Sequence, residues 1–289
     1  MSEKILISIC IPTYNRANYL DICLQSILHY KGDNIEVLIQ DNDSPDNTSE
    51  IVKKYDDPRF QYEKNDTNIG PIKSIWKLFN KARGEYVFCL TDDDYFLPGA
   101  IQKLVDFIES TSPVCFKTSL IMLLEKSKAS AYYKVKDDSK ESIFFNAHIF
   151  TGLCFRRKIL LEKVNEQFSN SYYPSMAIMG LLLNEATFFD EVIAMHIWEN
   201  EIFWDEGMDF GSNRLKNEIV DLILLLEPHT ENKLHKKLIL RCCLDNGFVY
   251  EKFEKYLTNE DKRNIYKSII TSKIKSFIVS IGKKLLGKN

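Results

Sequence analysis

Three consecutive carboxylates, Asp92, Asp93 and Asp94, follow directly after the apolar stretch 86–90. Adjacent carboxylates repel one another, so an opposite charge is needed to hold them together. A hard divalent cation binds oxygen ligands, and Mg²⁺ or Mn²⁺ usually binds together with a substrate phosphate. The triplet therefore predicts a site for Mn²⁺ or Mg²⁺. The alternative is an acidic turn at the start of a helix opened by Pro98, where Asp is favoured.

Two further polar clusters follow apolar stretches in the same way. Residues 12–16, Pro-Thr-Tyr-Asn-Arg, come after the apolar run 5–11, and the acidic loop 41–48 comes after 35–39. In a parallel sheet the carboxyl ends of the strands share one edge, where ligands bind. We therefore expect these clusters and the acidic triplet to meet at one rim. The competing explanation is that loops at strand ends are polar in any protein.

The elements that position these clusters alternate along the chain. Short apolar runs predict strands, and apolar residues at spacings of three to four predict helices. Strands are predicted at 5–11, 35–39, 60–64 and 86–90, with helices at 19–28, 49–55, 72–81 and 97–109. This order predicts an α/β fold with a Rossmann-related, mainly parallel sheet flanked by helices.

The second half predicts more strands and then only helices. Strands are expected at 114–124, 131–135, 151–155 and 188–198, with a helix at 175–184. A long polar loop at 199–213 precedes a helical pattern that continues to the end. We therefore predict a domain 1–212, made of a half 1–110 and a half 111–212, and a helical C-terminal extension 213–289.

Composition narrows the class of protein. The chain has 289 residues, 45% apolar, and no apolar run approaches the roughly 18 residues of a membrane span. The N-terminus lacks the features of a signal peptide, and the seven cysteines contain no CxxC spacing, which argues against zinc and redox sites. We expect a cytoplasmic protein that has no nucleic-acid partner.

The C-terminal tail carries an uneven charge. The net charge of the chain is −3, yet residues 262–289 hold eight Lys or Arg and no Asp or Glu. Apolar residues recur among these lysines at helical spacing. Such a basic amphipathic helix can bind an anionic membrane surface, here the inner face of the cell membrane. The alternative is a helix that packs on the domain with its lysines in water.

The polar clusters together resemble the family 2 glycosyltransferases, which have the GT-A fold. The motifs that carry the resemblance are residues 12–16, the loop 41–48, Asn68-Ile69-Gly70, and Arg83-Gly84-Glu85-Tyr86 leading to Thr91-Asp92-Asp93-Asp94. Their order and spacing match over about residues 4–110, and the resemblance is weaker to about 210.

The resemblance implies roles for these residues. Asp94 and Asp92 would bind the metal as parts of the DxD element, and Tyr14 could stack on the nucleotide base while Asp41 accepts a base N–H. Arg16 and Lys73 could add positive charge near the phosphates. The residues predicted to bind the nucleotide sugar are Pro12, Thr13, Tyr14, Asn15, Arg16, Asp41, Asp43, Asn68, Lys73, Asp92 and Asp93.

The resemblance also implies a general base in the second half of the domain. Inverting members use a carboxylate to deprotonate the acceptor hydroxyl, often in a Glu-Asp pair after a segment resembling Thr151-Gly152. That pair is missing at the usual distance in this chain. The base candidates are Asp190, Glu191 and Asp205. Asp190 and Glu191 could equally be a solvated cap of the last strand.

The resemblance implies a metal-dependent, inverting glycosyltransferase. It would move a sugar from a nucleotide-diphosphate donor, with a UDP-sugar as the leading candidate, to a hydroxyl of a polysaccharide or lipid-linked glycan. One alternative is a non-catalytic, membrane-associated module that binds nucleotide sugars, which the missing Glu-Asp pair supports. A weaker alternative is a sugar nucleotidyltransferase, but residues 12–18 contain no glycine to cradle a triphosphate.

Overall fold

The computed structural model describes residues 4–124, 129–133, 139–164, 174–198, 220–245, 253, 255–265 and 267. The chain divides into two compact units, Met1–Trp204 and Asp205–Asn289. Each unit is described by itself. The domain boundary predicted near residue 212 lies outside the described residues and stays a prediction.

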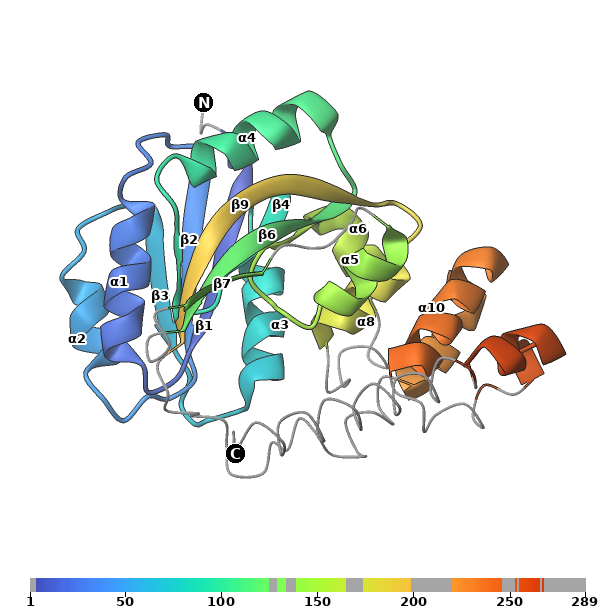
Figure 1. Ribbon diagram of the computed structural model, residues 1–289. Coiled ribbons are helices and arrows are strands. Elements are labelled where there is room, and N and C mark those ends of the chain that lie inside the picture. The colour runs from blue at the N-terminus through green and yellow to red at the C-terminus, as the bar shows by residue number, and fades with distance from the viewer. Residues whose placement is uncertain are drawn as a thin grey trace. The chain divides into compact units, whose positions relative to one another are not determined.

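The first unit is built on one sheet (Figure 1). Its strands are β1 (Ile7–Thr13), β2 (Ile35–Asp41), β3 (Phe60–Lys64), β4 (Tyr86–Cys89), β5 (Asp94–Phe96), β6 (Cys115–Leu124), β7 (Ala129–Tyr133), β8 (Leu153–Arg156) and β9 (Ala186–Trp198). The described strands follow the order β3-β2-β1-β4-β8-β6-β9-β5, and β7 pairs with β6. Strands β1, β2, β3, β4, β6 and β9 run in one direction, whereas β5, β7 and β8 run against them. The mainly parallel α/β sheet is confirmed.

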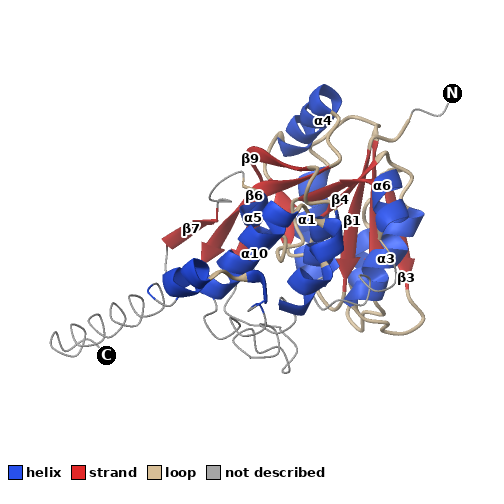
Figure 2. Ribbon diagram, turned by 90° about the vertical axis from the view of Figure 1, so that its right-hand side faces the viewer, coloured by secondary structure: helices blue, strands red, loops and turns tan. Residues whose placement is uncertain are grey.

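Helices cover the sheet on both faces. The described helices of this unit are α1 (Ala17–Ile27), α2 (Thr48–Lys53), α3 (Pro71–Lys81), α4 (Ala100–Thr111), α5 (Lys140–Asn146), α6 (Arg157–Lys163) and α8 (Pro174–Leu181). Helices α1 and α4 share one core with the inward side chains of β1 and β4. Helix α3 packs on β1 and β2 and contacts α6 (Figure 2).

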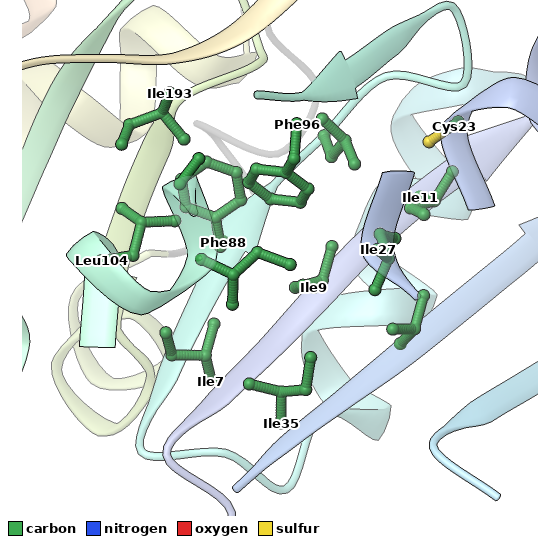
Figure 3. Packing of buried hydrophobic residues seen from close by; sticks show 14 of the residues in the cluster. Ile7, Ile9, Ile11, Cys23, Ile27, Ile35, Phe88, Phe96, Leu104 and Ile193 are labelled. Atoms are coloured by element: carbon green, nitrogen blue, oxygen red, sulfur yellow. The ribbon is translucent and has the colours of Figure 1, made fainter. Parts of the chain in front are cut away.

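The core under α1 and α4 also anchors the acidic triplet. Phe96 of β5 points into this core, where its ring centroid lies 5.4 Å from that of Phe88 on β4 (Figure 3). Ile9 of β1 and Leu104 of α4 belong to the same cluster. Because Phe96 is only two residues after Asp94, packing of this apolar ring fixes where the triplet enters β5.

Several local features differ from the expectation. The triplet does not lead directly into a helix, because β5 intervenes and α4 begins only at Ala100. Strand β5 pairs antiparallel with β9, a long-range contact that three residues do not reveal in sequence. The short helices α5 and α6 were not predicted. The strand expected at 131–135 is found two residues earlier as β7, and it pairs antiparallel with β6.

In the second unit the described elements are helical. Helix α10 (Asn232–Asp245) lies within the helical pattern predicted after residue 213, and a 3₁₀ turn, Glu227–His229, precedes it. The basic stretch 268–289 lies outside the described residues. Among the helices that the structure describes, none is long and apolar enough to span a membrane.

Candidate functional site

The strand ends meet at one rim, as predicted. In the parallel register Thr13 at the end of β1 lies beside Asp41 at the end of β2, and Cys10 lies beside Cys89 on β4. The backbone N–H of Asn42 donates to the Thr13 carbonyl at 2.9 Å. Because β1 lies between β2 and β4, its C-terminal loop is placed between the Asp41 loop and the acidic triplet.

Two side chains at the C-terminal end of β1 and just after it, Thr13 and Arg16, hold the first two carboxylates of the triplet. The Thr13 hydroxyl donates to Asp92 Oδ2 at 2.7 Å. Arg16 Nη1 lies 3.1 Å from Asp92 Oδ1 and 2.8 Å from Asp93 Oδ2. Burial raises the pKa of Asp92 to about 6, although the Arg16 charge acts against it. The arginine therefore supplies part of the opposite charge that the triplet requires.

Asp94 is buried and is held by a different set of groups. The Thr91 hydroxyl donates to Asp94 Oδ2 at 2.7 Å. The Thr151 hydroxyl lies 3.0 Å from the Thr91 hydroxyl and accepts the Thr91 backbone N–H at 2.9 Å. Sequence analysis singled out Thr151-Gly152 as an acceptor-side segment but did not foresee its contact with the triplet.

Lys117 on β6 places a buried amino group behind this cluster. Its Nζ donates to the carbonyls of Thr151 at 2.7 Å and Thr118 at 3.1 Å. Burial lowers the pKa of Lys117 to about 7, while the charge of Asp94 acts in the opposite direction. Nothing in the sequence marked Lys117, because a lysine within a strand is usually exposed.

The Asp41 carboxylate is fixed on both oxygens. Oδ1 accepts the backbone N–H of Ser44 at 2.8 Å, and Oδ2 accepts the Tyr62 hydroxyl at 2.5 Å. Burial and the bond to Asp41 raise the pKa of Tyr62 well above its usual range. Each carboxylate oxygen has a further acceptor position, so Asp41 can still accept an N–H from a ligand.

Amide side chains hold the neighbouring loop in place. Asn42 donates to Asn68 Oδ1 at 2.6 Å, and Asn42 Oδ1 accepts from Asn65 Nδ2 at 3.0 Å and from the Ile69 backbone N–H at 2.9 Å. The loop that ends at Gly70 is thereby fixed against the end of β2. Asn42 and Asn65 were not among the predicted site residues, although both follow directly after strands.

The remaining predicted donor residues surround this rim. Tyr14 is exposed (45%) next to Thr13, and Asn15 adopts a left-handed φ of 54° that turns the chain into α1. Asp43 also has a left-handed φ, 68°, and pairs with Lys64 at 3.4 Å. Pro12 is half-buried within β1, and Lys73 is exposed in the first turn of α3.

Two of the three proposed base residues, Asp190 and Glu191, are not brought to the triplet. Asp190 and Glu191 form a bulge in β9 opposite Thr118 and Ser119, and Glu191 pairs with Lys103 of α4 at 2.7 Å. The register places Asp94 opposite His196 of β9. His196 comes five residues after Glu191, so the two positions are on the order of 15 Å apart along the strand. Asp205 lies outside the described residues.

The donor atoms at the triplet fit a hard divalent cation. Mg²⁺ and Mn²⁺ bind through one or two carboxylates and substrate phosphates, and Asp92 and Asp94 supply such carboxylates. In the part of the chain that the structure describes, no cluster of three or more His, Cys, Asp or Glu side chains is arranged to hold a metal. Further oxygens would therefore have to come from the substrate or from water.

The sequence motifs agree with one known family. The model of the family "Glycosyl transferase family 2" matches residues 8–161, more than half of the chain. The chain belongs to family 2 of the glycosyltransferases. This matched segment contains β2 to β8, nearly all of β1, and the residues Thr13, Arg16, Thr91 and Thr151 described above around the acidic triplet.

Curated relatives of this family 2 protein include two named glycosyltransferases. The GalNAc(5)-diNAcBac-PP-undecaprenol beta-1,3-glucosyltransferase of Campylobacter jejuni is 27% identical over 237 residues, which cover 79% of this chain and 75% of the relative. Abequosyltransferase RfbV of Salmonella typhimurium is 34% identical over 115 residues, 38% of this chain and 34% of the relative. The chain thus matches only about a third of the length of some relatives.

Solved structures show the same architecture. TarS 1–349 of S. aureus, in complex with UDP-GlcNAc, superposes with a TM-score of 0.65 and 17% identity, covering 91% of this chain and 79% of TarS. Mannosyltransferase PcManGT from Pyrobaculum calidifontis, in complex with GDP-Man and Mn²⁺, gives a TM-score of 0.61 and 14% identity over 100% of this chain and 89% of PcManGT. The fold is therefore GT-A.

Proposed function

We propose that the protein is a metal-dependent, inverting glycosyltransferase. It transfers a sugar from a nucleotide-diphosphate donor to a hydroxyl of a polysaccharide or lipid-linked glycan. The observation that carries the proposal is the convergence of Thr13, Arg16 and Asp92 to Asp94 beside Asp41 at one rim of the sheet. The lipid-linked acceptor is suggested by the name of the Campylobacter relative.

The rim offers a distinct group for each part of a nucleotide-diphosphate donor. The exposed Tyr14 ring can stack on the base, and the fixed carboxylate of Asp41 can accept a base N–H. A uracil N–H fits this acceptor, as a guanine or thymine N–H does, and the TarS complex with UDP-GlcNAc supports a UDP-sugar as the leading candidate. Lys73 at the start of α3 and Arg16 add positive charge on the side where the phosphates would lie.

Mn²⁺ or Mg²⁺ would be held by Asp92 and Asp94 together with the diphosphate. When bound, the cation neutralises the negative charge that develops on the departing nucleotide. Within the chain, Thr13 and Arg16 orient Asp92, and Thr91 orients Asp94. These bonds hold both carboxylates in one orientation before the donor binds, so binding does not have to restrict their motion.

The base that deprotonates the acceptor hydroxyl is proposed among Asp190, Glu191 and Asp205. The ion pair with Lys103 and the distance along β9 weigh against Glu191. Inversion requires a base on the acceptor side, opposite the departing nucleotide. Failure to hydrolyse or transfer the donor, with donor binding intact, would instead support the non-catalytic binding module.

We also propose that residues 262–289 bind an anionic membrane surface. Their lysines alternate with apolar residues at helical spacing, and no acidic residue interrupts them. A lipid-linked acceptor would be located at such a surface. Localisation at the inner face of the cell membrane follows from this proposal.

Calorimetry on the full chain tests the donor site. Wild type, Asp94→Ala and the control Asp106→Asn, an exposed residue on α4, are titrated with UDP, GDP, CDP and dTDP, each with and without Mn²⁺. We expect one nucleotide to bind in a metal-dependent manner, and Asp94→Ala to weaken this binding at least about tenfold while Asp106→Asn does not. If folded wild type binds none of them, the donor-site assignment is wrong.

A further inference from the structure

The Thr151–Gly152 turn is joined to the acidic triplet by a continuous set of hydrogen bonds. Thr151 is fully buried, and its hydroxyl contacts both the backbone N–H and the hydroxyl of Thr91. The Thr91 hydroxyl in turn lies 2.7 Å from Asp94 Oδ2. These bonds connect residues 60 positions apart in sequence, across the strands β4 and β8.

Counting protons fixes the direction of each bond. An ionised Asp94 can only accept, so the single Thr91 hydroxyl proton points to Asp94. The Thr91 oxygen must then accept the proton of the Thr151 hydroxyl. The Thr151 oxygen itself accepts the Thr91 backbone N–H. Thr151 therefore fixes Thr91 through two bonds and leaves its hydroxyl proton only one direction, toward Asp94.

The turn that carries Thr151 is itself tightly held. The buried Lys117 ammonium donates to the Thr151 carbonyl at 2.7 Å. Gly152 has a left-handed φ of 84°, and a Cβ at this position would collide with Thr118 Oγ1. The backbone of Gly152 bonds to Cys89 at 3.0 Å and to Thr118 at 2.9 Å. The turn is thus fixed from β4 on one side and β6 on the other.

We propose that Thr151 is a positioning residue that sets the orientation of Asp94 through Thr91, and that Lys117 anchors the turn on which Thr151 sits. The inference rests on the proposed function in one respect, the assignment of Asp94 as a metal ligand. It adds that hydrogen bonds connect the Thr151–Gly152 turn to Asp94, the carboxylate proposed to bind the metal. Groups that orient the ligands of a metal typically change metal affinity ten- to a hundredfold when removed.

Two substitutions at one position separate the hydroxyl from the packing. Thr151→Val keeps the shape of the side chain but removes both bonds to Thr91, whereas Thr151→Ser keeps the hydroxyl. The matched control is Thr118→Val, because the Thr118 hydroxyl is also buried, lies in the adjacent strand and has no hydrogen-bond partner. Thermal unfolding of each variant verifies that the protein is folded.

The readout is the Mn²⁺ concentration that gives half-maximal binding of the nucleotide diphosphate that wild type prefers. We expect Thr151→Val to raise this concentration about tenfold, Thr151→Ser to restore it to within about threefold of wild type, and Thr118→Val to leave it unchanged. A purely structural role would lower the unfolding temperature of Thr151→Val without this selective change.

The outcomes distinguish the inference from the function on which it rests. Metal-dependent binding by wild type, with an unchanged Mn²⁺ requirement in Thr151→Val, would overturn the inference alone. Absence of metal-dependent binding in wild type would overturn the donor-site assignment and the inference with it. If Thr151→Val does not fold, Thr91→Val removes the bond to Asp94 directly and should give the same rise in Mn²⁺ requirement.

Discussion

The buried lysine at position 117 predicts an unusual dependence of stability on pH. Lys117 is enclosed by the sheet, and its ammonium group donates to main-chain carbonyls without a carboxylate among these partners. Burial lowers its pKa from 10.5 to about 7. Replacing Lys117 with Met removes the buried charge but keeps most of the side-chain volume. The stability of this variant relative to wild type should therefore vary with pH.

The sign and size of the effect follow from proton binding. Between about pH 7 and 10, Lys117 is largely neutral in the folded protein and protonated in the unfolded chain, so the unfolded state binds more protons. The free energy of unfolding of wild type therefore rises with pH in this range, by up to about 1.4 kcal/mol per pH unit. From pH 7.5 to 9.5 the gain is roughly 2–3 kcal/mol, and Lys117→Met lacks it.

Urea unfolding followed by circular dichroism at pH 7.5 and 9.5 measures this difference. Comparing Lys117→Met with wild type at each pH cancels the titration of the groups that do not interact with Lys117. Lys140→Met is the matched control, since Lys140 also donates to two main-chain carbonyls but is only half-buried near the surface. Our reasoning would be refuted if the stability difference between Lys117→Met and wild type were the same at both pH values.

Two further predictions concern regions away from the rim. Glu36 is buried at the opposite end of β2 and accepts hydrogen bonds from Ser8, Gln61 and Arg83. Glu36→Ala should lower the free energy of unfolding by about 1–3 kcal/mol in urea titrations without changing nucleotide affinity measured by calorimetry, because the buried Ser8 hydroxyl loses its acceptor while the exposed Arg83 can turn to water. In the tail, changing Lys273 and Lys275 to Glu should reduce co-sedimentation with vesicles rich in phosphatidylglycerol severalfold, because each basic residue contributes about 1 kcal/mol at an anionic surface. Changing Lys53 and Lys54 to Glu serves as the control. Equal binding by both variants would contradict the tail proposal.

The first half of the fold was predictable because its signals are local. Apolar runs such as 35–39 and helical spacing such as 72–81 each lie within a dozen residues, and β2 and α3 are found there. The meeting of the polar clusters at one rim could be predicted from the parallel direction of the strands alone. Helix α5 carries a signal that could have revealed it, because Ser139 accepts the Ser142 backbone N–H at its start, as N-cap residues do.

The contacts within the site could not be predicted in this way. Arg16 and Asp92 are 76 residues apart, and their ion pair exists only because β1 and β4 are neighbours in the sheet. The bulge at Asp190 and Glu191 likewise depends on the register between β9 and β6, which a single strand does not specify. Both carboxylates read as candidate bases in sequence, while the fold pairs Glu191 with Lys103.

The bonds that other residues make to the triplet also indicate how a cation and a donor would bind. Arg16 already balances part of the charge of Asp92 and Asp93, and Thr91 occupies one acceptor position of Asp94. A divalent cation therefore meets oriented carboxylates whose charge is partly neutralised, and its remaining oxygen ligands have to come from the diphosphate and from water. We expect weak binding of the metal alone and strong mutual enhancement with the nucleotide. By linkage, the factor by which Mn²⁺ tightens nucleotide binding must equal the factor by which the nucleotide tightens Mn²⁺ binding.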